Sequence, residues 1–181
     1  MQKMNDMLSS DLTDKVVLIT GGAQRVGAMT ARLLHAAGAN LVLHYRHSRQ
    51  SALALQAELN KQRKNSVILI QADLLETVKL KSIIKKSIEQ WGRLDILINN
   101  ASSFYATPMG NITERDWDDL TGSNLKAPFF LSQAAAPYLE KQQGCIINIV
   151  DIHAQRPMQE HSVYNIAKAG LAMLVKTLAF E

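Results

Sequence analysis

The sequence lacks the features of a secreted, disulfide-bonded or membrane-spanning protein. Its single cysteine, Cys145, excludes an internal disulfide, and the apolar run that it begins predicts a buried, unreactive thiol. The longest apolar stretches fall far short of the roughly 20 residues that cross a bilayer. Residues 1–10 have neither a continuous apolar core nor a small-residue cleavage site. We therefore expect a soluble protein of the reducing cytoplasm, with residues 1–14 forming a flexible tail.

A modest excess of positive charge does not indicate nucleic-acid binding. The chain has 20 Lys and Arg residues against 16 Asp and Glu residues, for a formal net charge of +4. The four lysines between positions 79 and 86 recur at spacings that solvate one helix face. No aromatic residues alternate with them, as they would in a nucleic-acid-binding surface. This small excess of positive charge fits an enzyme that binds an anionic cofactor. We expect no nucleic-acid or membrane partner, and we assign no residue to a metal.

Strand-like and helix-like patterns alternate along residues 15–181. With 181 residues, of which 47% are hydrophobic, the chain is long enough for one core and short for two. Short β-rich runs that are apolar on both faces predict a covered parallel sheet. Their alternation with helices predicts a single Rossmann-type, doubly wound α/β domain with three layers, α/β/α. The expected strands are 16–20, 40–45, 66–70, 95–99 and 145–150. The expected helices are 25–37, 49–62, 76–90, 114–141 with a break near Gly122 or Pro128, and 161–181.

The sequence also carries signals for where elements end. Gly38 can end the first helix in a left-handed conformation, and Thr113 with Asp116 can cap the start of the fourth. The fifth predicted strand would lie at an edge of the sheet, and an apolar edge is prone to aggregate. We therefore expect the natural chain to continue beyond Glu181 with further strands.

A glycine-bearing turn at 20–27 follows the first predicted strand and opens a helix. Gly21 and Gly27 can let backbone N–H groups approach a pyrophosphate at the helix N-terminus, so the turn predicts a dinucleotide site that includes Val26. Arg25 replaces a glycine of the usual fingerprint, and its guanidinium could grip cofactor phosphates or face the ligand. The alternative is a plain strand-helix turn that opens with a surface arginine.

The second predicted strand ends without the acidic residue that usually accepts the ribose hydroxyls of NAD. The residues in its place are Tyr45, Arg46, His47 and Ser48. A guanidinium, an imidazole and a hydroxyl suit a 2′-phosphate, which predicts NADPH as the cofactor. The alternative is the solvated start of a helix. Asp73 and Leu74, after the third strand, could cover the adenine, although an acid at a strand end is often a helix cap.

Tyr164 and Lys168 lie four residues apart in the last predicted helix and therefore share one face of it. The ammonium group of Lys168 is expected to lower the pKa of the Tyr164 phenol, which suits it to donate a proton while a cofactor delivers hydride. Asp151 stands shortly before this pair. A carboxyl group beside the phenol can exchange protons with basic ring nitrogens, whereas a serine would suit a ketone oxygen. We therefore expect a nitrogen heterocycle as the substrate.

With these motifs the chain resembles the short-chain dehydrogenase/reductase family and, within it, the pteridine reductases. The resemblance covers residues 15–181. It rests on the turn at 20–27, residues 43–48, residues 99–105, Asn124, the Tyr164 and Lys168 pair, and Asp151 in place of the family's usual serine. The resemblance implies that the cofactor contacts also include Asn100, Ala101, Ser102 and Lys168.

The resemblance also implies roles around the substrate. Asn124 would hold a water that completes a proton relay through Lys168. Phe104 would stack on one face of a pterin, with the nicotinamide on the other, and Ser102 and Arg25 would contact polar atoms of the pterin. From the residues alone, Phe104 could equally be a core aromatic residue and Asn124 a helix cap.

The function implied by the resemblance is NADPH-dependent reduction of dihydrobiopterin-like or dihydrofolate-like pterins to tetrahydro forms. The enzymatic alternative is a carbonyl reductase of 3-oxoacyl or small-ketone substrates, and a noncatalytic dinucleotide-fold module is the alternative from another class. The family commonly forms tetramers, so a homo-oligomer is expected. Because the family's sheet continues with two more strands and a segment that closes over the substrate, we expect the 181-residue chain alone to be poorly active.

Overall fold

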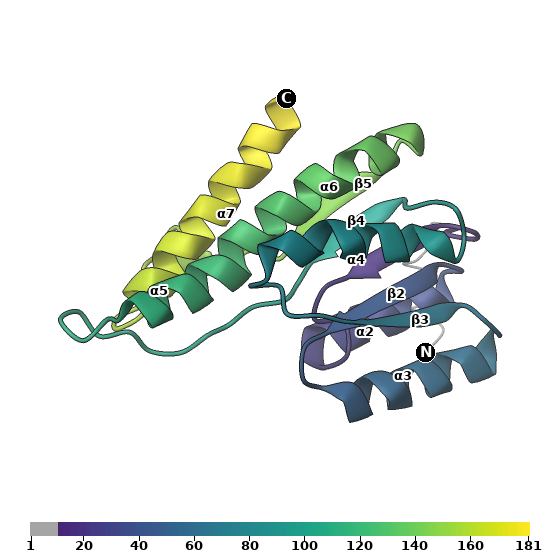
Figure 1. The fold of residues 1–181 in the computed structure, drawn as a ribbon, viewed down its shortest axis with the longest axis horizontal. Helices are drawn as coiled ribbons and strands as arrows, with labels where there is room; N and C mark the ends of the chain where they lie inside the picture. Colours follow the sequence, from purple (N-terminus) through teal and green to yellow (C-terminus); the bar gives the residue numbers. More distant parts are fainter. Residues whose placement is uncertain (1–10) are drawn as a thin grey trace.

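A five-stranded parallel sheet forms the centre of the computed structural model, which describes residues 11–181 (Figure 1). The strands lie in the order β3-β2-β1-β4-β5, so the chain crosses back over β1 between β3 and β4. This reversal places a crevice outside the carboxyl ends of β1 and β4, where doubly wound proteins bind ligands. The strands are β1 (Val16–Ile19), β2 (Asn40–Tyr45), β3 (Val67–Gln71), β4 (Ile96–Asn99) and β5 (Cys145–Asn148).

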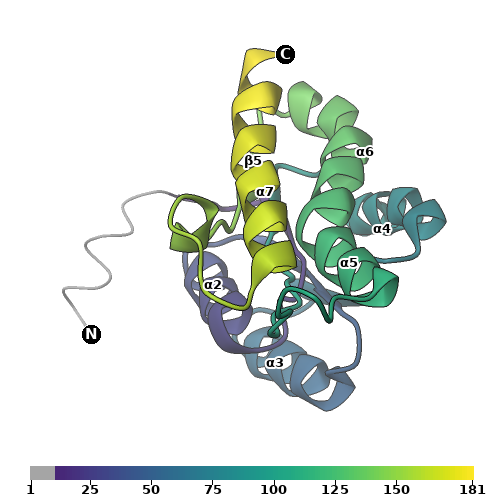
Figure 2. The same ribbon diagram turned by 90° about the vertical axis from the view of Figure 1, so that its left-hand side faces the viewer.

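Helices cover both faces of the sheet, and α6 and α7 run side by side (Figures 1 and 2). α2 and α3 pack on one face, whereas α4 and α6 pack on the other. The helices are α2 (Arg25–Ala36), α3 (Arg49–Gln62), α4 (Thr77–Glu89), α5 (Glu114–Thr121), the π-helix η1 (Gly122–Lys126), α6 (Ala127–Lys141), the 3₁₀-helix η2 (Ile152–Ala154) and α7 (Ser162–Phe180).

Alternate residues of β1 point into two apolar clusters. Val16 and Leu18 belong to the cluster that includes side chains of α4 and α6, whereas Val17 and Ile19 belong to the cluster that includes side chains of α2 and α3. Successive side chains of a strand point to opposite faces, and all four of these are fully buried. The predictions of a parallel sheet covered on both faces and of a single Rossmann-type α/β/α domain are therefore confirmed.

The predicted helix ends are found in the structure. Gly38 follows α2 with a φ of 101°, the left-handed conformation expected of a glycine cap. Thr113 and Asp116 form a reciprocal capping box, in which the Asp116 N–H donates to Thr113 Oγ1 at 3.2 Å and the Thr113 N–H donates to Asp116 Oδ2 at 3.0 Å. The expected break in the helix at 114–141 is the π-helix η1, which begins at Gly122.

α7 is 19 residues long and its mean hydropathy reaches 1.2 over 18 residues, so by length and composition alone it could cross a membrane. Its apolar runs are nevertheless short, because Asn165 and Lys168 interrupt them. The helix contacts α5, η1 and η2. It buries Val163, Leu171 and Leu174, as a core helix of an α/β protein does.

Two predictions at the margins of the domain are corrected. Cys145 is exposed rather than buried, because β5 lies at the edge of the described sheet. Residues 11–14 do not form the loose tail that was predicted, since the Leu12 N–H donates to the Ala37 carbonyl at 2.9 Å. The remainder of the predicted tail, residues 1–10, lies outside the described residues.

Candidate active site

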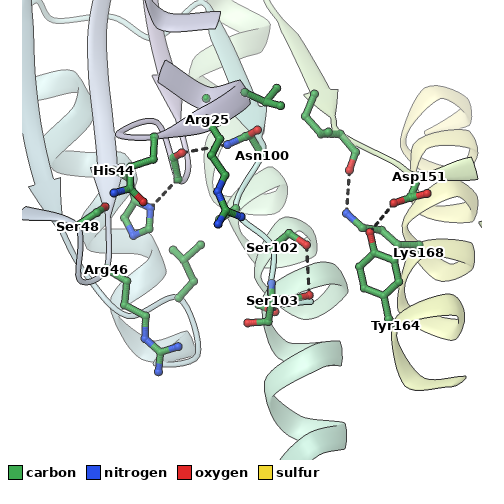
Figure 3. Close-up of a pocket in the computed structure, with 18 of the residues that line it drawn as sticks. Arg25, His44, Arg46, Ser48, Asn100, Ser102, Ser103, Asp151, Tyr164 and Lys168 are labelled. Carbon is green, nitrogen blue, oxygen red and sulfur yellow. Dashed lines mark hydrogen bonds between the residues drawn. The ribbon is translucent and has the colours of Figure 1, made fainter. Parts of the chain in front are cut away.

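A cavity of about 530 Å³ opens at the carboxyl ends of the central strands (Figure 3). Its walls come from the glycine-bearing turn before α2, the ends of β2 and β3, the segments after β4 and β5, and one face of α7. The predicted residues that line it are Gly21, Arg25, Val26, Gly27, Arg46, Ser48, Asp73, Leu74, Asn100, Ala101, Ser102, Asp151, Tyr164 and Lys168. The predicted residues outside its lining are Tyr45, His47, Phe104 and Asn124.

The glycine-bearing turn closes tightly against the end of β4. Asn100 Nδ2 donates to the carbonyls of Thr20 and Gly21 at 2.9 and 3.1 Å. A Cβ added to Gly27 would lie 2.4 Å from the Gly21 carbonyl oxygen and 2.8 Å from Asn100 Nδ2. Only glycine fits there without moving the backbone. The turn can therefore bring its N–H groups close to a phosphate at the N-terminus of α2.

Arg25 holds a left-handed backbone position at the start of α2, with a φ of 49°. Glycine adopts this conformation freely, whereas other residues meet a cost of about 1–2 kcal/mol. This explains why the fingerprint usually has glycine here. The exposed side chain of Arg25 lines the cavity and lies between Arg46 and Ser102 in Figure 3. The turn thus carries a cation into the site.

His44 joins the glycine-bearing turn to the end of β3. Its Nδ1 accepts the Gly21 N–H at 3.2 Å, so Nε2 carries the proton and donates to the Ala72 carbonyl at 3.1 Å. Burial lowers the pKa of His44 to about 4, which keeps the ring neutral at physiological pH. The sequence prediction did not include His44, although a titratable residue within the apolar run of β2 was a usable signal.

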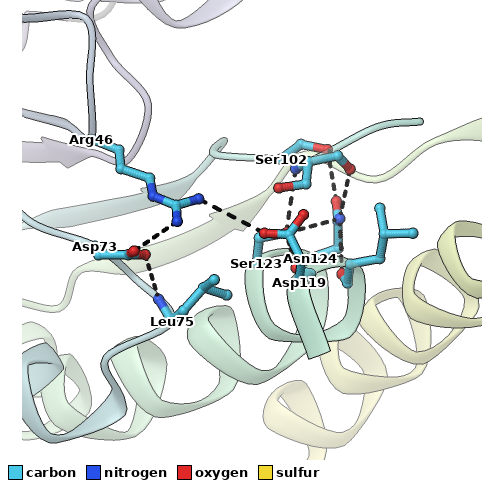
Figure 4. A network of polar contacts seen from close by, with 9 residues as sticks. Arg46, Asp73, Leu75, Ser102, Asp119, Ser123 and Asn124 are labelled. Atoms are coloured by element: carbon cyan, nitrogen blue, oxygen red, sulfur yellow. Dashed lines mark hydrogen bonds and ion pairs between the residues drawn. The ribbon is translucent and has the colours of Figure 1, made fainter. Parts of the chain in front are cut away.

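Arg46 reaches the part of the cavity that lies beyond β2 and β3. Its Nη2 is 2.8 Å from Asp73 Oδ2, and its Nη1 is 3.8 Å from Asp119 Oδ1 (Figure 4). Asp119 lies in α5 and was not predicted as a site residue, because nothing in the local sequence links α5 to the end of β2. Arg46 therefore lines the cavity, whereas its ion pairs with Asp73 and Asp119 were not predicted from the sequence.

The neighbours of Arg46 separate into two groups. Ser48 lines the cavity. His47 is exposed outside it. Tyr45 is buried, and its hydroxyl donates to Gln71 Oε1 at 3.4 Å. Of these four consecutive residues, only Arg46 and Ser48 therefore line the cavity.

Tyr164, Asp151 and Lys168 meet at the other end of the cavity (Figure 3). The Tyr164 hydroxyl donates to Asp151 Oδ2 at 2.7 Å. Asp151 is oriented by η2, because its Oδ1 accepts the His153 N–H at 3.1 Å. The Lys168 Nζ donates to the Ile149 carbonyl at 2.9 Å and lies 5.6 Å from the centroid of the Tyr164 ring.

The pKa of Tyr164 is shifted in the direction opposite to the one expected from the sequence. Burial and then the Asp151 carboxylate raise the pKa of Tyr164 above its ordinary value. The hydrogen bond from Tyr164 lowers the pKa of Asp151, and burial lowers the pKa of Lys168. The expected net lowering of the Tyr164 pKa is therefore wrong for this geometry, because burial and the Asp151 carboxylate outweigh the Lys168 ammonium. The group consists of a protonated phenol beside an ionised acid.

Asn124 lies buried in η1, next to the cavity wall (Figure 4). Its Oδ1 accepts the Ser102 hydroxyl at 2.7 Å, and its Nδ2 donates to the carbonyls of Ser103 and Leu120 at 2.9 and 3.0 Å. The side chain is thus a junction between the π-helix and the segment after β4, and it is not a helix cap. π-helical turns occur frequently at functional sites, and Ser123 of this turn lines the cavity.

Phe104 is 54% exposed, which rules out the alternative of a core aromatic residue. Its ring stacks on His161 with centroids 4.8 Å apart, and it meets the Tyr164 ring edge-on at 4.9 Å. An exposed aromatic face therefore lies next to the phenol of the site, although Phe104 is outside the cavity lining.

Comparisons with known proteins agree with this architecture. The family model for short chain dehydrogenases matches residues 15–181. Pteridine reductase 1 of Leishmania tarentolae is 34% identical over 96% of this chain and 73% of its own length. A probable galactose dehydrogenase, GalD, of Rhizobium meliloti is 33% identical over 93% of this chain and 66% of its own length. An uncharacterized oxidoreductase of Staphylococcus aureus is 30% identical over 94% of this chain and 72% of its own length. The chain spans about two thirds to three quarters of the length of these relatives.

Proposed function

The chain belongs to the short-chain dehydrogenase family of nicotinamide-dependent oxidoreductases, and within it we propose that this protein is an NADPH-dependent reductase of pterins. The observation that carries the proposal is the 2.7 Å hydrogen bond from the Tyr164 hydroxyl to the Asp151 carboxylate at the cavity wall. A ring with basic nitrogens needs a site that can both hold and deliver a proton, and this pair can do both. The similarity to pteridine reductase 1 supports the same substrate class.

The residues around the glycine-bearing turn fit a phosphorylated dinucleotide. Gly27 packs so closely on Gly21 that a Cβ there would displace the backbone, and this tight turn can bring its N–H groups to a pyrophosphate. Arg46 and Ser48 line the far end of the cavity, where a guanidinium and a hydroxyl suit a 2′-phosphate. Arg25 adds a second cation between the two ends. When bound, NADPH supplies a hydride to a carbon of the substrate.

The proton chemistry falls to Tyr164, Asp151 and Lys168. Tyr164 is protonated at neutral pH and can donate its proton to a ring nitrogen as hydride arrives on the adjacent carbon. Burial and Asp151 raise the pKa of the phenol and so oppose this transfer. The donation leaves a phenolate beside the ionised Asp151. The Lys168 ammonium, 5.6 Å from the ring centroid, offsets part of that charge. Tyr164 and Asp151 therefore titrate as a pair.

Phe104 and Ser102 support a flat, polar substrate. The Phe104 ring is half exposed beside Tyr164, and an aromatic face of this kind can stack on a pterin. The Ser102 hydroxyl donates to Asn124 Oδ1 at 2.7 Å, which leaves its oxygen lone pairs available to accept a hydrogen bond from a ring substituent.

A carbonyl or sugar oxidoreductase is the second candidate. The specific observation in its favour is the probable galactose dehydrogenase, whose identity to this chain, 33%, is nearly that of pteridine reductase 1. The carboxylate at Asp151 argues against this candidate, because a serine suits a ketone or alcohol oxygen better.

The test measures NADPH oxidation by the purified full-length protein with dihydrobiopterin, dihydrofolate and an acetoacetyl thioester, side by side. We expect turnover with at least one dihydropterin and little with the thioester, whereas turnover of the thioester alone would favour a carbonyl reductase. Asp151→Ser sharpens the comparison and should lower pterin turnover by about 10²-fold, as should Tyr164→Phe. Full pterin turnover by the Asp151→Ser variant would rule out the proposed role of the carboxylate.

A further inference from the structure

Arg46, the cation proposed for a 2′-phosphate, meets two carboxylates from distant parts of the chain (Figure 4). Asp73 follows β3 and is fixed by its own turn, because its Oδ1 accepts the Leu75 N–H at 3.0 Å. Its Oδ2 lies 2.8 Å from Arg46 Nη2. This short ion pair holds the guanidinium in place without any contribution from α5.

Asp119 makes a longer contact with the same guanidinium. Its Oδ1 lies 3.8 Å from Arg46 Nη1, which is within reach of an ion pair but too far for a hydrogen bond. Asp119 is mostly shielded from water, with a side-chain exposure of 22%. Its charge is also felt by Tyr105, whose pKa is raised to about 12 by burial and then by Asp119 and Asp116. Asp119 therefore acts on Arg46 mainly as a second negative charge.

A 2′-phosphate would bring a third anionic group to a guanidinium that already meets two. We propose that Asp119 is a specificity-determining residue that competes with a 2′-phosphate for Arg46 and so limits the preference of the cavity for a phosphorylated dinucleotide. The inference rests on the proposed NADPH-binding role of Arg46. Competition outweighs any positioning effect of Asp119, because the shorter contact with Asp73 keeps Arg46 in place when Asp119 is replaced by a neutral residue.

The substitution Asp119→Asn removes the charge and little else. The Asp119 backbone carbonyl, which accepts the Ser123 hydroxyl at 2.7 Å, is retained. A matched control is Asp118→Asn, which changes the net charge equally on the same helix. Asp118 is exposed, and among the described residues its side chain forms no ion pair.

The experiment titrates the purified protein with adenosine 2′,5′-bisphosphate and with 5′-AMP by calorimetry. Exposed and partly exposed ion pairs contribute up to about 1 kcal/mol, so Asp119→Asn should bind the bisphosphate about two- to fivefold more tightly. Its affinity for 5′-AMP should not change, and Asp118→Asn should match the wild type with both probes. The double-mutant cycle adds Arg46→Ala. In this background Asp119→Asn should not change the affinity for the bisphosphate, because the guanidinium through which Asp119 acts is absent.

The outcomes separate this inference from the proposed function. If the wild type prefers the bisphosphate but Asp119→Asn binds it equally or more weakly, competition by Asp119 is wrong while the NADPH proposal stands. A gain that persists in the Arg46→Ala background would also overturn the inference, since Asp119 would then act without Arg46. If the wild type binds both probes equally, the NADPH assignment fails and the inference fails with it. Pterin turnover, measured separately, reports on the substrate proposal alone.

Discussion

Arg25 combines backbone strain with a charge in the cavity, and the two can be separated by substitution. In the folded state, its φ of 49° costs a non-glycine residue about 1–2 kcal/mol. A glycine avoids this strain, but its greater flexibility in the unfolded chain lowers stability by about 0.5–1 kcal/mol. We therefore predict that Arg25→Gly leaves the free energy of unfolding unchanged or raises it by up to about 1 kcal/mol. The same variant should lose affinity for NADPH or substrate, because the guanidinium that lines the cavity is gone.

Arg25→Ala is the matched control for this prediction. Alanine also removes the guanidinium but keeps a Cβ at the left-handed position, so it should lose ligand affinity without the gain in stability. Urea unfolding and Michaelis constants for NADPH and substrate measure the two effects. A glycine variant less stable than the alanine variant would show that the backbone at this position is not strained.

His44 should make stability depend on pH. Its pKa is lowered from 6.5 to about 4 by burial, so between these values the unfolded chain binds a proton that the folded chain does not. The contribution of His44 to the free energy of unfolding is therefore fully present above pH 6.5. It decreases as pH falls toward 4, by on the order of 3 kcal/mol. Unfolding free energies measured across this range should decrease less steeply in His44→Gln. His35, whose pKa burial also lowers, adds a decrease of the same sign in both proteins. An unchanged slope in His44→Gln would contradict this assignment.

At the scale of single residues, chemistry could be predicted where neighbours in sequence are neighbours in space. Tyr164 and Lys168 share a helix face because they are four residues apart. The pKa of Tyr164 could not be predicted in this way. It depends on Asp151, which reaches the phenol only because β5 and α7 bring the two together. Burial and the nearby Asp151 carboxylate raise the pKa of Tyr164 by more than the Lys168 amine, which the local sequence places nearby, lowers it.

At the scale of elements, the glycine-bearing turn can close tightly only because Gly27 has no side chain. We predict that Gly27→Ala lowers cofactor affinity by about tenfold or more, because the added Cβ would lie 2.4 Å from the Gly21 carbonyl and must displace the backbone. Calorimetric titration with NADPH measures the loss, and thermal unfolding reports the strain separately. Wild-type affinity in Gly27→Ala would mean that the turn does not need this close approach.

The elements themselves were largely predictable, because apolar runs and capping residues are local signals. The strand Asn40–Tyr45 and the helix Arg49–Gln62 have the bounds expected from sequence. The break near Gly122 was also predicted, but its π-helical form was not. That form depends on tertiary contacts, since Asn124 bonds to Ser102 and Ser103 and a Cβ on Gly122 would lie 2.6 Å from Leu75.

At the scale of the whole molecule, the alternation of strands and helices predicted the doubly wound fold, because this alternation has few compact arrangements. The contact between Arg46 and Asp119 could not be inferred, because it depends on how α5 lies relative to the ends of β2 and β3. Such a contact is fixed by packing between elements, which no local pattern encodes.

The helices α6 and α7 leave apolar side chains on the surface that suggest how copies of the chain associate. Phe129 is 43% exposed and Met173 is 60% exposed, and we predict that these side chains are covered by a second copy in a homo-oligomer. Burying a phenylalanine contributes about 1.5–3 kcal/mol, and a buried carboxylate is costly, so Phe129→Glu should weaken association by tenfold or more. Light scattering during size-exclusion chromatography measures the mass in solution. Leu53→Glu, at an exposed apolar position of α3, is the matched control and should leave the mass unchanged. If Phe129→Glu keeps the mass of the wild type, or if the wild type is a monomer, copies of the chain do not associate through this face.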